Sequence, residues 1–233
     1  SGKWHLGLTP EQDPAKRGFQ HSFALLQGGH NHFGLQLAVD PTKGYTYRED
    51  GKTLGSLPAD FYSSDYFAAK LADQIRQTKA GSDSTKPFFA YLAFTAPHWP
   101  LQAPAETIAR YKGRYDAGYD VLRDQRLKRQ IELGLLDAKT VPHAAEVAPR
   151  WDTLTPEQKA RESRRMEVYA AMVDRLDWNV GHVIAALRET GELDNTVILF
   201  LADNNAKKTA LENRSIPEMG TRYDAADNRL ENI

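Results

Sequence analysis

Two short runs of apolar residues, at positions 87–94 and 196–201, constrain the fold of this chain more than any other feature. Both runs are continuous rather than alternating, and both are bounded by turn-forming residues. A continuous apolar run of this length is typical of a strand that is covered on both faces, as in a parallel sheet flanked by helices. We therefore predict strands at about 87–94 and 196–202, in one mixed and largely parallel sheet with helices on both faces.

Helical patterns occupy much of the remaining sequence. A helix is predicted over about 64–79, with Phe67, Leu71 and Ile75 on its inward face. Another is predicted over about 121–133, where a basic cluster without interleaved aromatic residues indicates a solvated face. This cluster consists of Arg123, Arg126, Lys128 and Arg129. The order of helix, strand, helices and strand indicates an α/β fold.

The longest helical pattern begins where Thr155 precedes Pro156, which combines an N-cap residue with a proline in the first turn. Gly191 is expected to end this helix. Apolar residues at three- or four-residue spacing predict a single inward face between these limits. This stripe consists of Tyr169, Val173, Leu176, Val180, Ile184 and Leu187.

Composition argues against several classes of protein. The 233 residues carry a formal net charge of −1, which gives no general attraction for nucleic acid or for an anionic membrane surface. No apolar segment approaches the roughly 20 residues that cross a bilayer. The chain has no cysteine, so it can form neither disulfides nor thiolate metal sites. We expect one large domain that binds neither nucleic acid nor membrane, while its compartment stays open.

Polar residues follow both predicted strands. Residues 87–94 lead to His98, which is flanked by prolines, and residues 196–202 lead to Asp203 and Asn204. Open α/β sheets bind ligands beyond the carboxyl ends of their strands, so we expect these residues at one edge of the sheet. A histidine on a rigid loop can donate a proton, and the oxygens of aspartate and asparagine suit Ca²⁺ or Mg²⁺.

Lys3 and His5 form a further candidate pair near the start of the chain. In an extended stretch, residues two apart point to the same side, so a lysine charge and a histidine donor would face one ligand. A sulfate or phosphate ester needs such fixed cations, together with a proton donor for the departing oxygen. Each of these residues alone has an ordinary structural explanation, but together they predict an anion-binding site.

Three segments, in this order, resemble the type I sulfatases, the formylglycine-dependent arylsulfatases of the alkaline-phosphatase superfamily, in their bacterial form. They are residues 3–7 (Lys-Trp-His-Leu-Gly), 96–101 (Ala-Pro-His-Trp-Pro-Leu) and 202–206 (Ala-Asp-Asn-Asn-Ala). The resemblance runs from Ser1 to about Ala206. It implies an alkaline-phosphatase-like fold, with a mixed and mostly parallel sheet flanked by helices. Residues 1–233 are then expected to be part of a sulfatase catalytic domain.

The resemblance also implies roles for the matched residues. Lys3 and His5 would contact the sulfate and the catalytic formylglycine. His98 would contact the sulfate ester and protonate its leaving oxygen. Asp203 and Asn204 would ligate Ca²⁺, or Mg²⁺ in its place. The substrate would be a small-molecule sulfate ester.

Asn31 and His32 stand in the family's Asn-His-aromatic position, so the resemblance places them in the lining of the substrate pocket. Other features depart from the family. The Gly of its Asp-Asn-Gly segment is Asn205 here, and the upstream acidic pair and a later lysine have no counterpart. The C/S-x-P-x-R nucleophile motif is also missing, because Ser215 is followed by Met219 where the motif has arginine.

We therefore expect the nucleophile segment and the C-terminal part of the domain to be absent, and the chain alone to be inactive. A full-length protein would require a formylglycine-generating enzyme as a partner. Two alternatives stay open. One is a phosphate or phosphonate ester hydrolase of the same superfamily, because lysine, histidine and calcium do not by themselves distinguish sulfate from phosphate. The other is a non-catalytic, truncated remnant.

Overall fold

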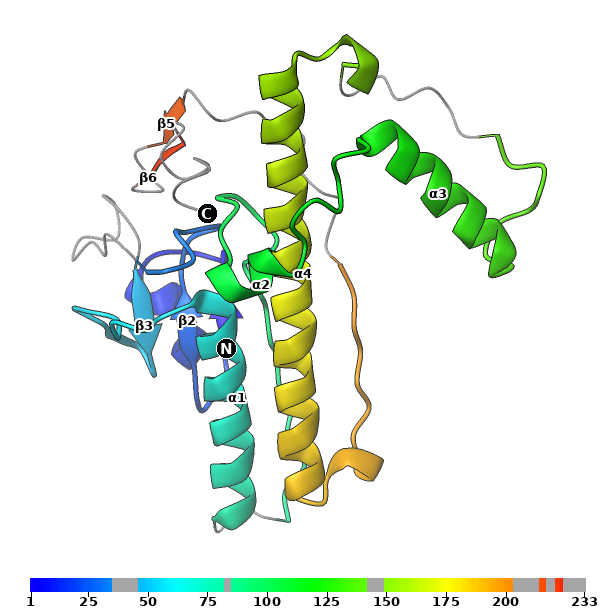
Figure 1. Ribbon diagram of the computed structural model, residues 1–233. Helices are drawn as coiled ribbons and strands as arrows, with labels where there is room; N and C mark the ends of the chain where they lie inside the picture. The colour runs from blue at the N-terminus through cyan, green and yellow to red at the C-terminus, as the bar shows by residue number, and fades with distance from the viewer. Residues whose placement is uncertain (35–45, 82–84, 142–148, 203–213, 217–220, 224–233) are drawn as a thin grey trace.

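A computed structural model describes residues 1–34, 46–81, 85–141 and 149–202, together with the backbone of two further short strands. A four-stranded sheet in the order β1-β2-β3-β4 lies between Gly2 and Thr53, near the start of the chain (Figure 1). β1 pairs with β2 in parallel, and the β2–β3 and β3–β4 pairs are antiparallel, so the sheet is mixed, as predicted. The strands are β1 (Gly2–Lys3), β2 (Phe23–Leu25), β3 (Tyr47–Glu49) and β4 (Lys52–Thr53).

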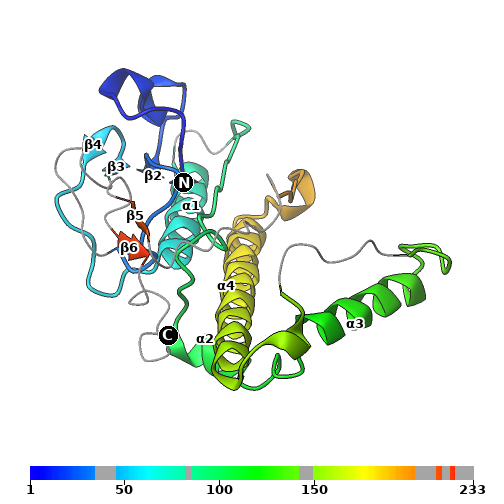
Figure 2. The same cartoon turned by 90° about the horizontal axis from the view of Figure 1, so that it is seen from above.

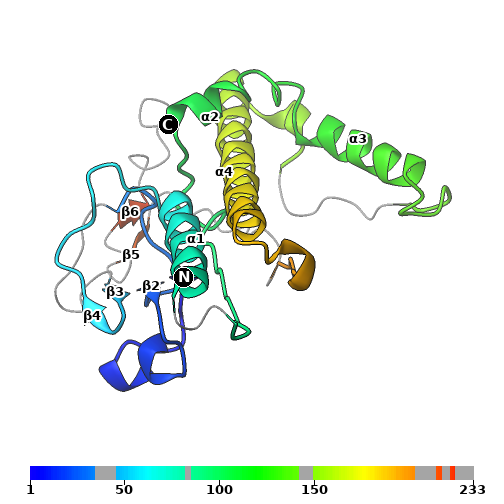
Figure 3. The same ribbon diagram turned by 90° about the horizontal axis from the view of Figure 1, so that it is seen from below.

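Four helices are the longest elements in the rest of the described structure. All three views place α1 between the sheet and α4, while α3 projects away from both (Figures 1, 2 and 3). The helices are α1 (Ser63–Ala80), α2 (Ala105–Ala109), α3 (Tyr119–Glu132) and α4 (Pro156–Glu189). Four 3₁₀ turns are η1 (Pro10–Gln12), η2 (Pro14–Lys16), η3 (Trp151–Thr153) and η4 (Leu193–Asn195). A separate antiparallel hairpin consists of β5 (Arg214–Ile216) and β6 (Thr221–Tyr223).

Helix α1 joins the sheet to α4, and its predicted inward face is confirmed. Phe67 is fully buried in a cluster with Phe23 of β2 and with aromatic residues of the neighbouring strand and loop. Leu71 and Ile75, one and two turns later, pack with Leu187 of α4. One helix face therefore serves two adjoining clusters along its length.

The predicted limits of α4 are also confirmed. The Thr155 hydroxyl accepts the backbone N–H of Gln158, and the Gln158 side chain accepts the backbone N–H of Thr155. This reciprocal capping box satisfies two donors that a helix start otherwise leaves unpaired. The helix ends at Glu189, two residues before Gly191.

The predicted inward face of α4 is confirmed in part, because Leu187 is buried and Tyr169 and Leu176 pack against a buried cluster, but other positions of the predicted stripe are not buried. Val173 is 42% exposed, whereas Val168 and Met172 are fully buried. The buried face also includes Glu167 and Asn179, which are hydrogen-bonded to the loop before α3 and to α1. A pattern of apolar residues alone therefore misses part of the buried face of α4, because these two polar residues are also buried.

The strand predicted at 87–94 is not formed. Its one ladder contact is an isolated parallel bridge between Ala93 and Gly2 of β1, and Phe89 and Tyr91 are exposed. Because β1 is only two residues long, it offers backbone partners to a short part of the run. The bridge is parallel, as expected for neighbouring segments in the predicted largely parallel sheet.

The strand predicted at 196–202 is not formed either. The stretch is extended but pairs with no other segment in the described part of the chain, and Leu199 is 81% exposed. Apolar character favours a buried strand only where neighbouring strands supply hydrogen-bonding partners and cover. The prediction that Asp203 and His98 lie at one edge of the sheet stays a prediction, because Asp203 is outside the described ranges.

The remaining sequence predictions concern α3 and the membrane. Arg126, Lys128 and Arg129 are exposed on α3, in agreement with a solvated basic face. Among the helices that the structure describes, none has the length and apolar character of a membrane span.

The exposure of residues 196–201 can be tested by a pair of substitutions. In the 233-residue chain, we expect Leu199→Ala to change the free energy of unfolding by no more than about 0.5 kcal/mol, because its side chain is in solvent. The buried Leu71→Ala should cost about 2–5 kcal/mol. Urea denaturation measures both. A loss above about 2 kcal/mol for Leu199→Ala would show that the run is a buried strand after all.

Candidate functional site

Three parallel backbone segments end at one edge of the sheet. β1 pairs with β2 through Gly2–Ala24 and Lys3–Leu25, and on its other side Gly2 bridges Ala93, again in parallel. The chain leaving each segment at its carboxyl end carries predicted site residues. This edge therefore gathers residues from three separate parts of the sequence.

The first segment ends in Lys3 and His5. The Lys3 N–H donates to the Ala93 carbonyl at 2.8 Å, and the His5 N–H donates to the Leu26 carbonyl at 3.0 Å. His5 has a φ of 55°, which is uncommon for a residue with a side chain. The backbone is therefore not extended at His5. The prediction that the side chains of Lys3 and His5 point to the same side assumed an extended backbone, so it does not hold there.

Gly28 makes room for the His5 ring. It follows β2 in the chain, and a Cβ atom built on Gly28 would lie only 2.7 to 3.1 Å from three atoms of the His5 imidazole. The ring thus lies directly against the Gly28 backbone. Glycine at position 28 allows this contact, whereas any side chain there would displace the His5 ring.

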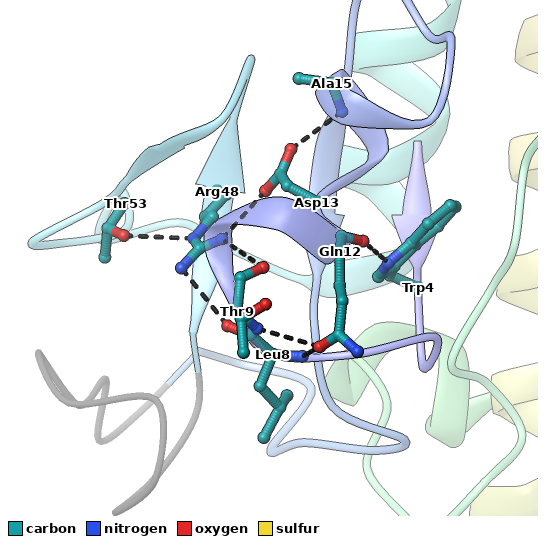
Figure 4. Close-up of polar contacts among 8 residues, drawn as sticks. All are labelled: Trp4, Leu8, Thr9, Gln12, Asp13, Ala15, Arg48 and Thr53. Atoms are coloured by element: carbon teal, nitrogen blue, oxygen red, sulfur yellow. Dashed lines mark hydrogen bonds and ion pairs between the residues drawn. The ribbon is translucent and has the colours of Figure 1, made fainter.

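A hydrogen-bonded cluster supports the loop that follows His5 (Figure 4). The indole N–H of Trp4 donates to the Gln12 carbonyl at 2.8 Å. The Gln12 side-chain oxygen accepts the backbone N–H groups of Leu8 and Thr9 at 3.1 and 3.3 Å. Trp4 therefore anchors the backbone between Lys3 and His5 to the turn η1.

A buried ion pair closes the same cluster. Nη1 of Arg48 lies 3.3 Å from Oδ2 of Asp13, and both side chains are almost fully buried. The other Asp13 oxygen accepts the Ala15 N–H at 2.9 Å. The guanidinium also donates to the carbonyls of Leu8 and Thr9 and to the hydroxyl of Thr53. We call these residues the Arg48–Asp13 clamp; it ties the loop after His5 to β3.

The third segment leads to His98. The His98 N–H donates to the Thr95 carbonyl at 2.9 Å, which closes a turn. Its ring Nδ1 lies 2.8 Å from the Trp99 carbonyl oxygen, and a carbonyl can only accept, so Nδ1 carries a hydrogen. Nε2 is therefore the ring nitrogen that can take up or release a proton.

Asn31 and His32 lie inside the protein. The Asn31 side-chain oxygen accepts the Phe33 N–H at 2.9 Å, a local turn contact. His32 is fully buried, and burial lowers its pKa to about 4. Nδ1 of its ring lies 2.9 Å from the Ser63 hydroxyl, and Nε2 lies 3.0 Å from the His98 carbonyl oxygen. The ring thus contacts the His98 loop; its contact with a substrate stays a prediction that this geometry does not favour.

The predicted metal ligands Asp203 and Asn204 lie outside the described residues. Within the described ranges, no group of three or more His, Cys, Asp or Glu residues is placed to hold a metal ion.

Sequence reasoning missed the Arg48–Asp13 clamp and Gly28. Arg48 and Asp13 are 35 positions apart, so no local pattern joins them. Gly28 had a signal, because it stands in a Gly-Gly pair that follows an apolar run after one intervening residue, Gln27. Such a pair favours a turn or a close approach of two backbones.

Comparison with known proteins gives a consistent result. The sequence model of the sulfatase family matches residues 1–222. An uncharacterized sulfatase of Schizosaccharomyces pombe is 48% identical, over 100% of this chain and 43% of its own length. An arylsulfatase of Klebsiella aerogenes is 40% identical, over 100% of this chain and 49% of its own length. The chain thus spans about half the length of these relatives.

A solved structure shares the fold. The crystal structure of Ps i-CgsB in complex with k-i-k-neocarrahexaose matches with a TM-score of 0.51 at 24% identity. The match covers 83% of this chain and 34% of that one. The described elements therefore adopt part of a known α/β arrangement.

The Arg48–Asp13 clamp can be tested by removing its cation. We expect Arg48→Met to lower the free energy of unfolding by about 3–5 kcal/mol, because the Asp13 carboxylate stays buried without its partner. Asp13→Asn combined with Arg48→Met should lose less than the sum of the single changes. The control is Arg76→Met, which breaks an exposed pair with Glu189 and should cost several times less. Equal losses for Arg48→Met and Arg76→Met would contradict the clamp.

The buried His32 predicts a pH dependence of stability. Its pKa is about 4 in the folded chain against about 6.5 when unfolded, so between these values the unfolded state binds more protons. The stabilisation is complete above about pH 6.5 and declines as the pH falls through about 4, by roughly 3 kcal/mol in total. Denaturation at several pH values should show a smaller decline for His32→Gln than for the unsubstituted chain. If stability declined with pH equally in His32→Gln and in the unsubstituted chain, His32 would not be the buried, neutral histidine described here.

Proposed function

Because the chain belongs to the sulfatase family, we propose that the whole protein hydrolyses sulfate monoesters, with aryl sulfates among its substrates. The observation that best supports this is the common edge at which the segments bearing Lys3, His5 and His98 end. A sulfate monoester presents several negatively charged oxygens to such an edge. The three side chains supply one fixed cation and two groups that can donate hydrogen bonds.

Each side chain has a distinct part in the proposed reaction. The Lys3 ammonium binds a non-bridging sulfate oxygen and holds the ester in place. The His5 imidazole donates a hydrogen bond to the same group. When the bond between sulfur and the ester oxygen breaks, Nε2 of a protonated His98 passes its proton to the departing oxygen, so that the alcohol or phenol leaves uncharged. The Nδ1–H···O=C bond to Trp99 orients the ring for this transfer.

The family's two auxiliary groups are part of the proposal. Formylglycine would supply the hydroxyl that attacks sulfur, and Ca²⁺ or Mg²⁺ would neutralise sulfate charge. Asp203 and Asn204 would hold the metal, since their side chains offer the oxygen donors that hard cations prefer. Calcium usually takes six to eight oxygens, so these two residues would fill part of its shell. The 233 residues contain no cysteine, and their Ser215-x-Pro-x-Met219 segment lacks the arginine of the nucleophile motif.

The function can be tested with a panel of aryl esters on the full-length gene product. We expect turnover of an aryl sulfate to exceed that of the matched aryl phosphate. His98→Ala should lower the sulfate turnover by about 10²–10⁴-fold, because the departing oxygen loses its proton donor. The effect should be largest for esters of poorly acidic alcohols or phenols, which depend most on protonation.

Two controls accompany this panel. His182→Ala changes an exposed histidine on α4, and it should leave turnover unchanged. The 233-residue chain assayed alone should show no turnover, because it encodes no nucleophile of the required kind. A dominant phosphatase rate would contradict the sulfatase proposal. Full sulfate turnover by His98→Ala would remove His98 from the chemistry.

A further inference from the structure

His32 has no part in the proposed reaction, yet it is among the most buried polar residues of the described structure. Its imidazole lies between the N-terminal end of α1 and the loop that carries His98. Burying a polar ring is unfavourable unless its nitrogens are hydrogen-bonded. The contacts of the two ring nitrogens therefore indicate why a histidine is placed here.

The contact with His98 fixes the tautomer of His32. Nε2 lies 3.0 Å from the His98 carbonyl oxygen, and because a carbonyl oxygen can only accept, Nε2 must carry the hydrogen. In the neutral ring Nδ1 is then an acceptor. The Ser63 hydroxyl, 2.9 Å away, is placed to donate to it.

A second hydroxyl extends this arrangement. The Thr95 hydroxyl lies 3.2 Å from the Ser63 oxygen and 3.4 Å from Nδ1 of His32, so Thr95 can donate to Ser63 while Ser63, at the shorter distance, donates to His32. Thr95 and Ser63 are both buried. Each of the three polar side chains can thus donate to the next group: Thr95 to Ser63, Ser63 to His32, and His32 to the His98 carbonyl.

The backbone around His32 holds the far end of the same loop. The His32 N–H donates to the side-chain oxygen of Gln102 at 2.9 Å, and the Tyr62 hydroxyl donates to the Gln102 carbonyl at 3.0 Å. The Ser63 N–H donates to the His32 carbonyl at 2.8 Å. The loop from Thr95 to Gln102 is therefore held at its start, at its middle and at its end by residues next to His32.

We propose that His32 is a positioning residue for His98: its Nε2–H group holds the His98 carbonyl, and the Ser63 hydroxyl keeps the ring in that tautomer. The proposal rests on the proposed function for the role of His98, whereas the positioning itself rests on the contacts above. Displacing a reacting group by roughly 1 Å can cost about a hundredfold in rate. A fixed carbonyl beside the His98 ring thus bears directly on catalysis.

The first test is NMR of the 233-residue chain with ¹⁵N-labelled histidine. We expect the neutral Nε2–H tautomer for His32 at about pH 6, where an exposed histidine is largely protonated or in exchange. An Nδ1–H tautomer or a cationic His32 ring would overturn the proposal. This measurement needs no substitution, so it stands even where a variant fails to fold.

The second test compares two variants. In His32→Leu the donor to the His98 carbonyl is lost, whereas the amide of His32→Gln can place a donor near the former Nε2. We expect the His98 imidazole signals to shift or broaden in His32→Leu and to return close to their original positions in His32→Gln. His21→Gln, at an exposed site, serves as the control. Identical His98 signals in the Leu and Gln variants would reduce His32 to a packing residue and overturn the proposal.

An activity measurement on the full-length gene product links the two proposals. We expect His32→Leu to lower kcat for an aryl sulfate by roughly 10- to 100-fold with little change in KM, and His32→Gln to recover most of the loss. An unaltered kcat in a folded His32→Leu variant would overturn positioning. A full-length protein without sulfatase activity would instead refute the proposed function, and the NMR results would still decide the role of His32.

Discussion

The close packing of the Gly2 backbone against Ala93 is the contact on which the candidate site depends. A Cβ atom on Gly2 would lie 2.1 Å from the Ala93 carbonyl oxygen, and Gly2 has a φ of 120°, so only glycine fits without displacing one of the two backbones. On its other side Gly2 pairs with Ala24 of β2. This narrow central strand brings three chain segments into parallel alignment. Their following loops consequently meet at one edge, although they are far apart in sequence.

Two separate hydrogen-bonded clusters then hold the loops that leave this edge. The Arg48–Asp13 clamp holds the loop after His5 through its backbone carbonyls, and His32 holds the His98 loop through a carbonyl as well. The Arg48–Asp13 ion pair and the His32 ring are buried, and both hold these loops through backbone carbonyls. Reacting groups gain from such support because a fixed geometry lowers the cost of reaching the transition state. The two loops can thus be perturbed one at a time.

The sequence predicted well those features that depend on local chemistry. Thr155 with Pro156 gave the start of α4, and the spacing of Phe67, Leu71 and Ile75 gave the inward face of α1. Features that depend on distant partners were missed or wrong. The runs at 87–94 and 196–201 are apolar enough for buried strands, but within the described ranges the first has a single bridge to β1 and the second has no ladder partner. The pair of Arg48 and Asp13 joins residues 35 positions apart, so no local pattern predicts it.

The same division applies to the candidate site. Short motifs predict Lys3, His5 and His98 as site residues, because they contain the residue types that the proposed chemistry requires. The residues that hold these side chains in place could not be predicted from local motifs. The contact of His32 is with a carbonyl 66 positions away, and the need for glycine at position 28 depends on where the His5 ring lies. The most direct test is a sulfate titration of the chain, followed by the ¹⁵N signals of its histidine rings. We expect saturable shifts at His5 and His98, with the exposed His182 on α4 unchanged. Equal shifts at all three rings, or none at His5 and His98, would contradict a common anion site at this edge.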